Sequence, residues 1–272
     1  MTSAAPGTDR TVTAGGLCLA TRRRPGPQGP PLLLVHGLGG SMGSWEPLLE
    51  ALPERDVVMI DTPGMGRSEL PALPLSIGAL ADRIADAVRT LDLDVVDVLG
   101  FSHGGTVAQE LAHRHPALVR RLVLVATVAG IPWLPPRLRA GLALLSTRRY
   151  HDRAAAERDL RLLAGGRTAR DPEALRGIID DRAANPPSTR GYRYLQIPVL
   201  WWSSHLWLHT LRCRTLVVAG RDDPVVRSVN ASVLAARIAD SRLALLPDAG
   251  HMLLFDESQR AARLLTEFLD AP

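Results

Sequence analysis

Lysine is absent from this sequence of 272 residues, so all 32 basic side chains are arginines. The complete absence of one basic residue indicates a coding bias rather than selection for a basic surface. The arginines are spread along the chain and interleaved with acidic residues, which leaves a net charge of only +4. Because no nucleic-acid-binding motif accompanies this charge, we expect no nucleic-acid partner.

Long apolar runs are also missing. No run approaches the roughly 18 residues that a helix needs to cross a bilayer. The polar N-terminal segment Met1–Arg10 lacks the basic-then-apolar pattern of a signal peptide. We therefore expect no transmembrane segment and a location in the cytoplasm.

Cysteine is scarce, and the two cysteines, Cys18 and Cys213, lie far apart in the chain. They form neither a C-x-x-C pair nor a metal-type pattern. The sequence leaves a disulfide between them open, but two free thiols in a reducing compartment are the expectation. We expect no bound metal and no cofactor, and the sequence predicts no particular oligomeric state.

The rest of the composition, 46% hydrophobic and 22% charged, is typical of a globular protein. Short apolar runs alternate with helical patterns, which predicts an α/β fold with a mostly parallel sheet and helices on both faces. The predicted core strands are Leu32–Val35, Val57–Ile60, Val95–Leu99, Leu122–Ala126, Leu216–Ala219 and Leu243–Leu246. Two further segments, Thr11–Thr13 and Leu17–Thr21, resemble an antiparallel edge hairpin and bring the sheet to eight strands.

Helices are expected in three places within this core. One is capped by Ser76, because apolar residues recur at helical spacing after it. Another starts after Ser102, and the last covers about Glu257–Leu269.

One long stretch, rich in Arg, Leu, Pro and Trp, breaks the alternation between the fourth and fifth core strands. A structureless loop of that length is uncommon in a compact domain. We therefore predict a helical cap over residues 130–210, inserted into a core formed by residues 1–129 and 211–272.

The strongest chemical signal is Gly100-Phe101-Ser102-His103-Gly104, which follows a buried strand and precedes a helix. Glycines at both ends permit a sharp turn that exposes the serine hydroxyl above the edge of the sheet. A glycine-rich turn with an idle serine would not explain the motifs that follow. We therefore predict that Ser102 is a nucleophile, which at neutral pH needs a base oriented by a third group.

The best candidate for the base is His251, which lies between a late strand and the last helix. The acid is expected after the strand Leu216–Ala219, which runs into Gly-Arg-Asp-Asp-Pro. Two adjacent carboxylates, Asp222 and Asp223, therefore compete for the role that orients the histidine.

A second glycine-rich loop, His36-Gly37-Leu38-Gly39-Gly40, follows the first core strand. It lacks the Lys-Ser/Thr of a phosphate-binding P-loop and the spacing of a dinucleotide site. We predict instead that the main-chain N–H groups of Leu38 and His103 form an oxyanion hole.

These motifs in this order resemble the α/β-hydrolase superfamily, and Asp61–Ser68 is similar to its D-x-P-G-x-G-x-S loop. The resemblance places the acid three residues after a glycine, which selects Asp223 over Asp222. A serine nucleophile argues against the epoxide hydrolase and haloalkane dehalogenase branches, which use aspartate there.

The second half resembles intracellular medium-chain-length polyhydroxyalkanoate depolymerases. The segments that carry this resemblance are Ala126–Gly130, Ser146–Tyr150, Tyr192–Leu195, His205–His209 and Leu216–Pro224. The resemblance implies hydrolysis of 3-hydroxyacyl esters by the same triad. The sequence departs from that family at His103, where an aromatic residue is expected, and at His36, so a soluble ester or thioester fits equally well.

Four of the five tryptophans lie in the predicted cap, namely Trp133, Trp201, Trp202 and Trp207. They could line an apolar acyl pocket, or they could pack the cap onto the core. The other residues expected in this pocket are Leu134, Leu195, Ile197, Val199 and Leu200, with His36 and Gly37.

The sequence therefore predicts a cofactor-independent hydrolase of small-molecule or polymeric acyl esters. A thioesterase, a lactonase or an acyl-transfer enzyme could use the same triad. A non-catalytic binding module is disfavoured, because such proteins usually lose one triad member.

Overall fold

The computed structural model describes residues 7–272. Residues 1–6 lie outside the described residues. They belong to the N-terminal segment that is expected to lack a signal peptide. The described residues form one eight-stranded sheet in the order β1-β2-β4-β3-β5-β6-β7-β8. Its strands are β1 Thr8–Ala14, β2 Leu17–Arg24, β3 Gln28–Val35, β4 Arg55–Ile60, β5 Val96–Phe101, β6 Val119–Val125, β7 Arg214–Gly220 and β8 Ser241–Leu246.

The first two strands form the expected antiparallel hairpin, and β2 also pairs antiparallel with β4. All pairings from β4 across to β8 are parallel. Every residue of β4 and β5 is buried, which explains why their sequences are mostly apolar, because both faces of a parallel sheet are covered. The predicted α/β-hydrolase sheet is confirmed.

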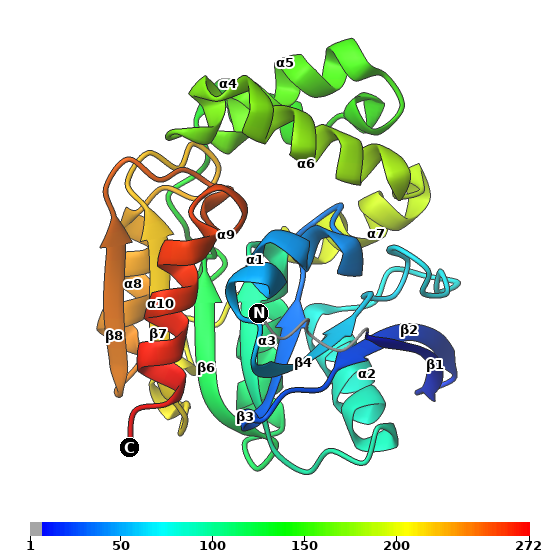
Figure 1. The fold of residues 1–272 in the computed structure, drawn as a ribbon, viewed down its shortest axis with the longest axis vertical. Helices are drawn as coiled ribbons and strands as arrows, with labels where there is room; N and C mark the ends of the chain where they lie inside the picture. The colour runs from blue at the N-terminus through cyan, green and yellow to red at the C-terminus, as the bar shows by residue number, and fades with distance from the viewer. Residues whose placement is uncertain (1–6) are drawn as a thin grey trace.

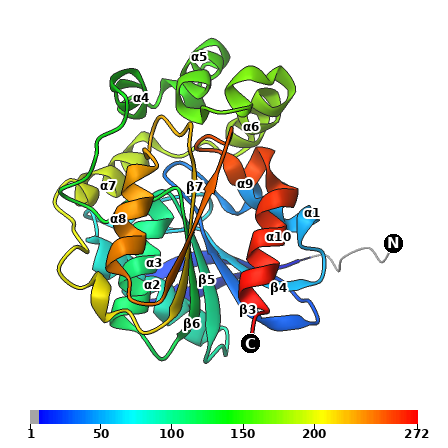
Figure 2. The same ribbon diagram turned by 90° about the vertical axis from the view of Figure 1, so that its left-hand side faces the viewer.

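Helices cover both faces of this sheet (Figures 1 and 2). On one face, α2, α3 and α8 pack with the strands in one apolar cluster, and on the other face α1, α9 and α10 do so in a second. The bounds of these helices are α1 Glu46–Ala51, α2 Ile77–Thr90, α3 His103–Arg114, α8 Val229–Arg237, α9 Leu253–Asp256 and α10 Ser258–Leu269. The Ser76 side chain accepts from the N–H of Ala79 at the start of α2, as the sequence predicts.

Four helices are inserted between β6 and β7, and three of them, α4 to α6, lie over the carboxyl ends of the strands (Figure 1). The inserted helices are α4 Leu138–Leu144, α5 Arg153–Ala164, α6 Pro172–Ala184 and α7 Thr189–Val199. Short 3-10 helices complete the chain, namely η1 Met42–Trp45, η2 Arg148–Tyr150, η3 Thr168–Arg170 and η4 Leu208–Thr210. We call residues 130–210 the cap, and their division from the core as a separate domain stays a prediction.

The two ends of the cap are joined to each other by main-chain hydrogen bonds. Ile131 N donates to the carbonyl of Trp202 (3.0 Å), and Ser204 N donates to the carbonyl of Ala129 (2.8 Å). The Ser204 hydroxyl also donates to Gln109 Oε1 on α3 (2.8 Å). These contacts, which we call the root contacts, fix where the cap leaves and re-enters the core.

Within residues 7–272, no helix is both long and apolar enough to cross a bilayer. Cys18 is exposed and Cys213 is buried, and both are free thiols.

Candidate active site

Ser102 lies in the turn between β5 and α3, with backbone angles φ 53° and ψ −119°. Few residues other than glycine adopt a positive φ, so the surrounding packing must hold this conformation. Its main chain is held on both sides, because Ser102 N donates to the Val125 carbonyl (2.8 Å) and the Thr127 hydroxyl donates to the Ser102 carbonyl (2.7 Å).

The flanking glycines are required by close backbone approach. A Cβ at Gly104 would collide with the carbonyl oxygen of Val35, and one at Gly100 would lie 2.5 Å from the carbonyl oxygen of Gly104. The turn can therefore be this tight only with glycine at both positions.

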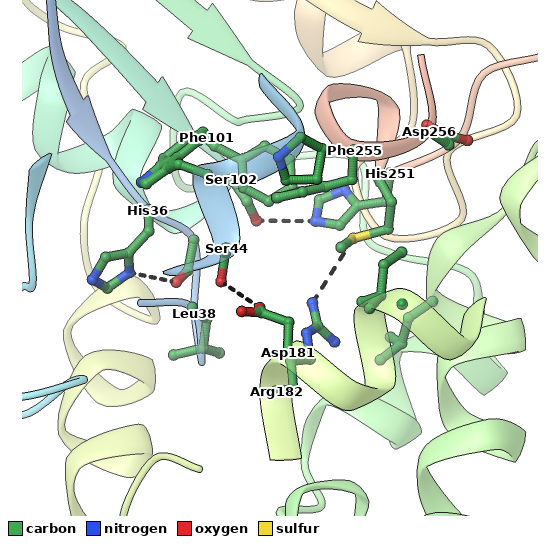
Figure 3. Close-up of a pocket in the computed structure, with 18 of the residues that line it drawn as sticks. His36, Leu38, Ser44, Phe101, Ser102, Asp181, Arg182, His251, Phe255 and Asp256 are labelled. Atoms are coloured by element: carbon green, nitrogen blue, oxygen red, sulfur yellow. Dashed lines mark hydrogen bonds between the residues drawn. The ribbon is translucent and has the colours of Figure 1, made fainter. Parts of the chain in front are cut away.

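The three residues predicted to form a triad come together around the Ser102 side chain. His251 Nε2 lies 3.1 Å from Ser102 Oγ, and His251 Nδ1 lies 2.8 Å from Asp223 Oδ2 (Figure 3). Asp223 is buried, and its other oxygen accepts from the N–H groups of Val225 and Val226, each at 2.8 Å. These two donors keep the carboxylate oriented toward the imidazole.

The neighbouring carboxylate does not compete for this position. Asp222 is exposed, and its main-chain N–H donates to the Ala249 carbonyl (3.0 Å) in the turn that follows β7. The geometry therefore places Asp223 beside His251, as the resemblance implies.

This arrangement suits proton transfer from the serine. If His251 Nδ1 carries the hydrogen donated to Asp223, its Nε2 is free to accept the proton of the Ser102 hydroxyl. The acceptor-only carboxylate then stabilises the imidazolium that forms. A group of three such residues can activate a serine for attack on an acyl carbonyl.

The loop after β3 is anchored by a buried histidine. His36 Nε2 accepts from the N–H of Thr62 (3.1 Å), and its Nδ1 donates to the Gly37 carbonyl (2.9 Å). Burial lowers the pKa of His36, which keeps the ring neutral. His36 therefore holds the loop, and His36 and Gly37 both line the first of the two cavities described below, as predicted.

The D-x-P-G-x-G-x-S segment ties two loops together through one carboxylate. Asp61 accepts from the N–H of Met42 (2.8 Å) and from the N–H of Arg67 (2.9 Å). The aspartate thus connects the segment after β4 to η1, next to the glycine-rich loop.

Leu38 lies in the loop after β3, and His103 directly follows Ser102. The main-chain N–H groups of these two residues are expected to form an oxyanion hole. Among the hydrogen bonds of residues 7–272, neither group donates to a protein acceptor. His103 N is the first N–H of α3, where helical hydrogen bonding provides no partner. Both donors are therefore available, and their catalytic role stays a prediction.

Two cavities meet at Ser102, and both are also lined by Leu38, Leu144 and Val225. The first, of about 470 Å³, is lined by His251, and we call it the His251 cavity. The second, of about 450 Å³, is lined by His103, and we call it the His103 cavity.

The walls of the two cavities differ in chemistry. The His103 cavity is lined mainly by apolar side chains, namely Val128, Trp133, Leu134, Pro136, Leu145, Ile197, Val199 and Leu200. The His251 cavity carries several charged groups, namely Glu46, Arg149, Asp181, Arg182 and Asp256.

The structure corrects most of the prediction for the tryptophans. Trp133 does line the His103 cavity. Trp201 is 79% exposed, Trp202 packs in the core and donates to Glu110 (2.7 Å), and Trp207 stacks on His113 at 4.3 Å between ring centroids. Residues of α3 provide partners for Trp202 and Trp207 but not for the exposed Trp201, and none of the three lines either cavity.

The cap supplies two cavity residues that sequence reasoning missed. The Arg149 guanidinium lies over the rings of Tyr150 and Tyr192, at 4.7 and 5.1 Å from their centroids, and donates to the Ala143 carbonyl (2.8 Å). A Cβ at Gly39 would collide with the Tyr150 hydroxyl. The cap therefore contacts the glycine-rich loop directly through Tyr150.

Two further missed residues, Asp181 and Arg182, project from α6 into the His251 cavity (Figure 3). The Ser44 hydroxyl donates to Asp181 (3.0 Å), and burial raises the pKa of this carboxyl. Their only sequence signal was a charged stretch on a helix, which is usually a solvated face. Among the described residues, no cluster of three or more potential metal ligands occurs.

A family model of the α/β-hydrolase fold matches residues 30–258, most of the chain. The chain belongs to the α/β-hydrolase fold family. It is 35% identical over 263 residues to a poly(3-hydroxyalkanoate) depolymerase of Ectopseudomonas oleovorans, covering 96% of this chain and 92% of that protein. This relative agrees with the resemblance seen in the second half of the sequence.

Other α/β-hydrolases are similar at lower identity. A 2-hydroxymuconate semialdehyde hydrolase of a Pseudomonas species is 28% identical, covering 97% of this chain and 94% of that protein. The crystal structure of an enol-lactonase from Burkholderia xenovorans superposes with a TM-score of 0.81 at 25% identity, covering 96% of this chain and all of that one. The names of these relatives describe a depolymerase, a semialdehyde hydrolase and an enol-lactonase, so their named substrates differ.

Proposed function

We propose that this α/β-hydrolase is a cofactor-independent serine hydrolase of carboxylic esters with apolar acyl chains, and that 3-hydroxyacyl esters are its substrates. The observation that carries the proposal is the hydrogen-bonded series Ser102–His251–Asp223 at the junction of two cavities. The similarity to a poly(3-hydroxyalkanoate) depolymerase over 96% of the chain supports the 3-hydroxyacyl class.

The reaction begins when Ser102 Oγ attacks the acyl carbonyl while His251 takes the serine proton. The N–H groups of Leu38 and His103 bind the oxyanion, and Asp223 stabilises the imidazolium. His251 then gives the proton to the departing alcohol oxygen. Water, activated in turn by His251, attacks the acyl-enzyme and releases the acid.

The two cavities suggest which half of the ester goes where. The base must reach the leaving oxygen, and only the His251 cavity is lined by His251. The alcohol half therefore occupies the His251 cavity. The acyl chain occupies the His103 cavity, whose apolar wall favours it through the hydrophobic effect.

A location in the cytoplasm is part of the same proposal. The free thiols of Cys18 and Cys213 support it, because reducing compartments keep cysteines unpaired.

The proposal is tested by a fluorophosphonate probe and by hydrolysis of 3-hydroxyoctanoyl esters. The wild-type protein should be labelled at Ser102, and Ser102→Ala should lose labelling and at least about 10⁴-fold in kcat while keeping its melting temperature. An unlabelled wild type, or a Ser102→Ala variant with full activity, would exclude the mechanism.

A second candidate is lactone opening by the same triad, which the likeness to an enol-lactonase favours. Matched substrates with one acyl chain, presented as an ester, a lactone and a thioester, separate these activities. We expect the highest kcat/KM for the ester. A preference for the lactone or thioester would move the chain to that class, and acyl transfer would appear as a product formed with an added alcohol.

A further inference from the structure

The helix α6 presents one face to the His251 cavity. Along this face, small residues, Ala174 and Gly177, are followed by the charged pair Asp181 and Arg182. The adjacent face of α6 is anchored by the buried side chains of Leu175 and Ile179. Such anchoring holds the charged pair at a defined place in the cavity wall.

Arg182 has no oxygen acceptor for its guanidinium. Within residues 7–272, its one hydrogen-bond partner is Met252 Sδ at 3.8 Å, and no carboxylate lies within 4.0 Å. A thioether is a weak acceptor, whereas a guanidinium favours two oxygens presented side by side. Figure 3 shows Arg182 extending from α6 toward the side of the cavity where His251 lies.

The other arginine in this cavity already has partners for both of its terminal NH₂ groups. Arg149 donates to a main-chain carbonyl and lies over two tyrosine rings. Arg182 is therefore the basic group of the described cavity wall that remains available to a ligand.

The acidic side chains of the cavity have other partners, and none of them pairs with Arg182. Asp181 accepts from Ser44, Asp256 accepts from the Thr168 hydroxyl, and Glu46 lies 3.4 Å from the Arg22 guanidinium. Burial raises the pKa of the Asp181 and Asp256 carboxyls.

We propose that Arg182 binds a free carboxylate on the alcohol half of the ester. The substrate class is then an ester of a hydroxy acid whose own carboxyl group is free, such as the carboxyl-terminal unit of a 3-hydroxyacyl oligomer. This inference rests on the proposed function, because it takes the His251 cavity as the site of the alcohol half.

The chemistry of the step is that of ordinary ester hydrolysis. The bond between the acyl carbon and the alcohol oxygen breaks, the acyl group passes to Ser102 Oγ, and His251 protonates the leaving oxygen. Water then releases the acyl group as a second acid. The alcohol half leaves as a hydroxy acid, with its carboxylate unchanged.

The test uses two substrates that share one acyl half. One is the dimer of 3-hydroxyoctanoate with its free carboxylate, and the other is the same dimer with that carboxylate converted to a neutral amide. We expect Arg182→Met to lower kcat/KM for the free acid by about ten- to a hundredfold, as for loss of a charge-assisted hydrogen bond. For the amide, kcat/KM should stay within about twofold.

Arg176→Met is the matched control, because Arg176 is exposed on the same helix and does not line the cavity. It removes the same charge and should leave both substrates unaffected. An equal loss on acid and amide in Arg182→Met, or no loss on either, would overturn the role of Arg182.

The outcome also separates the two proposals. A wild type that labels with fluorophosphonate and hydrolyses both dimers alike keeps the proposed function and overturns this inference. A wild type without labelling and without ester hydrolysis overturns both. Calorimetric binding of the free acid to Ser102→Ala, with and without Arg182→Met, measures the same contact without turnover, and equal affinities would contradict it.

Discussion

The His251 cavity and the His103 cavity are similar in volume, share Ser102 and both carry many apolar side chains, yet most of the charged side chains lie in the wall of the first. The His103 cavity offers apolar surface, which rewards each added methylene by a similar amount. The His251 cavity offers fixed charges and hydroxyl groups, which discriminate by the presence or absence of one group. The difference teaches that the two halves of an ester would be selected by different forces on either side of one nucleophile.

The largest expected effect comes from a substitution in the triad, because its serine, Ser102, lines both cavities. Asp223→Asn would present an amide N–H to His251 Nδ1 and favour the wrong tautomer. We expect kcat/KM to fall by about ten-thousand-fold for every ester, whatever its acyl chain or alcohol. Steady-state kinetics on the substrate panel would show it, and Asp222→Asn is the exposed control. A loss confined to one substrate half would contradict a shared triad.

The next effect concerns stability and arises from His103, after which one of the cavities is named. Burial lowers the pKa of His103 to about 4. The unfolded chain binds this proton from about pH 6.5 downward, so the folded state loses stability as pH falls from about 6.5 to about 4. The loss from His103 is roughly 3 kcal/mol, and urea unfolding at several pH values measures it.

The control for this slope is His103→Phe. Neither ring nitrogen of His103 meets a hydrogen-bond partner among the described residues, so an aromatic ring without nitrogens can occupy the site. The variant should show a shallower dependence of unfolding free energy on pH. The part contributed by His36, whose pKa is also lowered by burial, should remain. An unchanged slope would exclude His103 as its source.

A smaller effect tests whether the acyl chain occupies the His103 cavity. Ile197 lines the His103 cavity, and Ile197→Trp would shorten the space for a chain. Since each buried methylene contributes about 0.8 kcal/mol, the loss of two methylene contacts predicts roughly a tenfold drop in kcat/KM for a ten-carbon acyl ester. A four-carbon ester should be unaffected. A uniform drop for both chains would place the acyl group elsewhere.

The smallest effect tests whether the alcohol half of the ester occupies the His251 cavity. Gly177 lines the His251 cavity, and a Cβ there would meet nothing within 4 Å. Gly177→Leu should lower kcat/KM about threefold to tenfold for a bulky alcohol, and leave a methyl ester with the same acyl chain unchanged. Replacing a glycine inside a helix should not lower the melting temperature, so thermal unfolding checks that any loss comes from the filled cavity.

The sheet and the residues around Ser102 could be predicted because local patterns determine them. Buried parallel strands need continuous apolar sequence, and a tight turn with a positive φ needs glycines beside it, as at Gly100 and Gly104. The choice between Asp222 and Asp223 came from family resemblance, since adjacent carboxylates look alike until the turn after β7 buries one of them.

The cap was less predictable because its side chains choose partners that are distant in sequence. Trp202 and Trp207 read as pocket residues by composition, but α3 provides an acceptor for one and a stacking ring for the other. The place of Arg182 could not be predicted, because nothing in the local sequence marks which turn of α6 faces the cavity. Only tertiary packing decides these orientations.

The root contacts also bear on how such a protein can change. The chain leaves the core at Ile131 and returns at Trp202, two points that hydrogen-bond to each other. A cap of different length or sequence can therefore be inserted between these two points without moving the sheet or the turn that holds Ser102. Exchange of one continuous segment of the gene, the part that encodes the cap, would therefore change the cavity walls that the cap provides. The residues proposed to transfer the proton lie outside this segment and would stay the same.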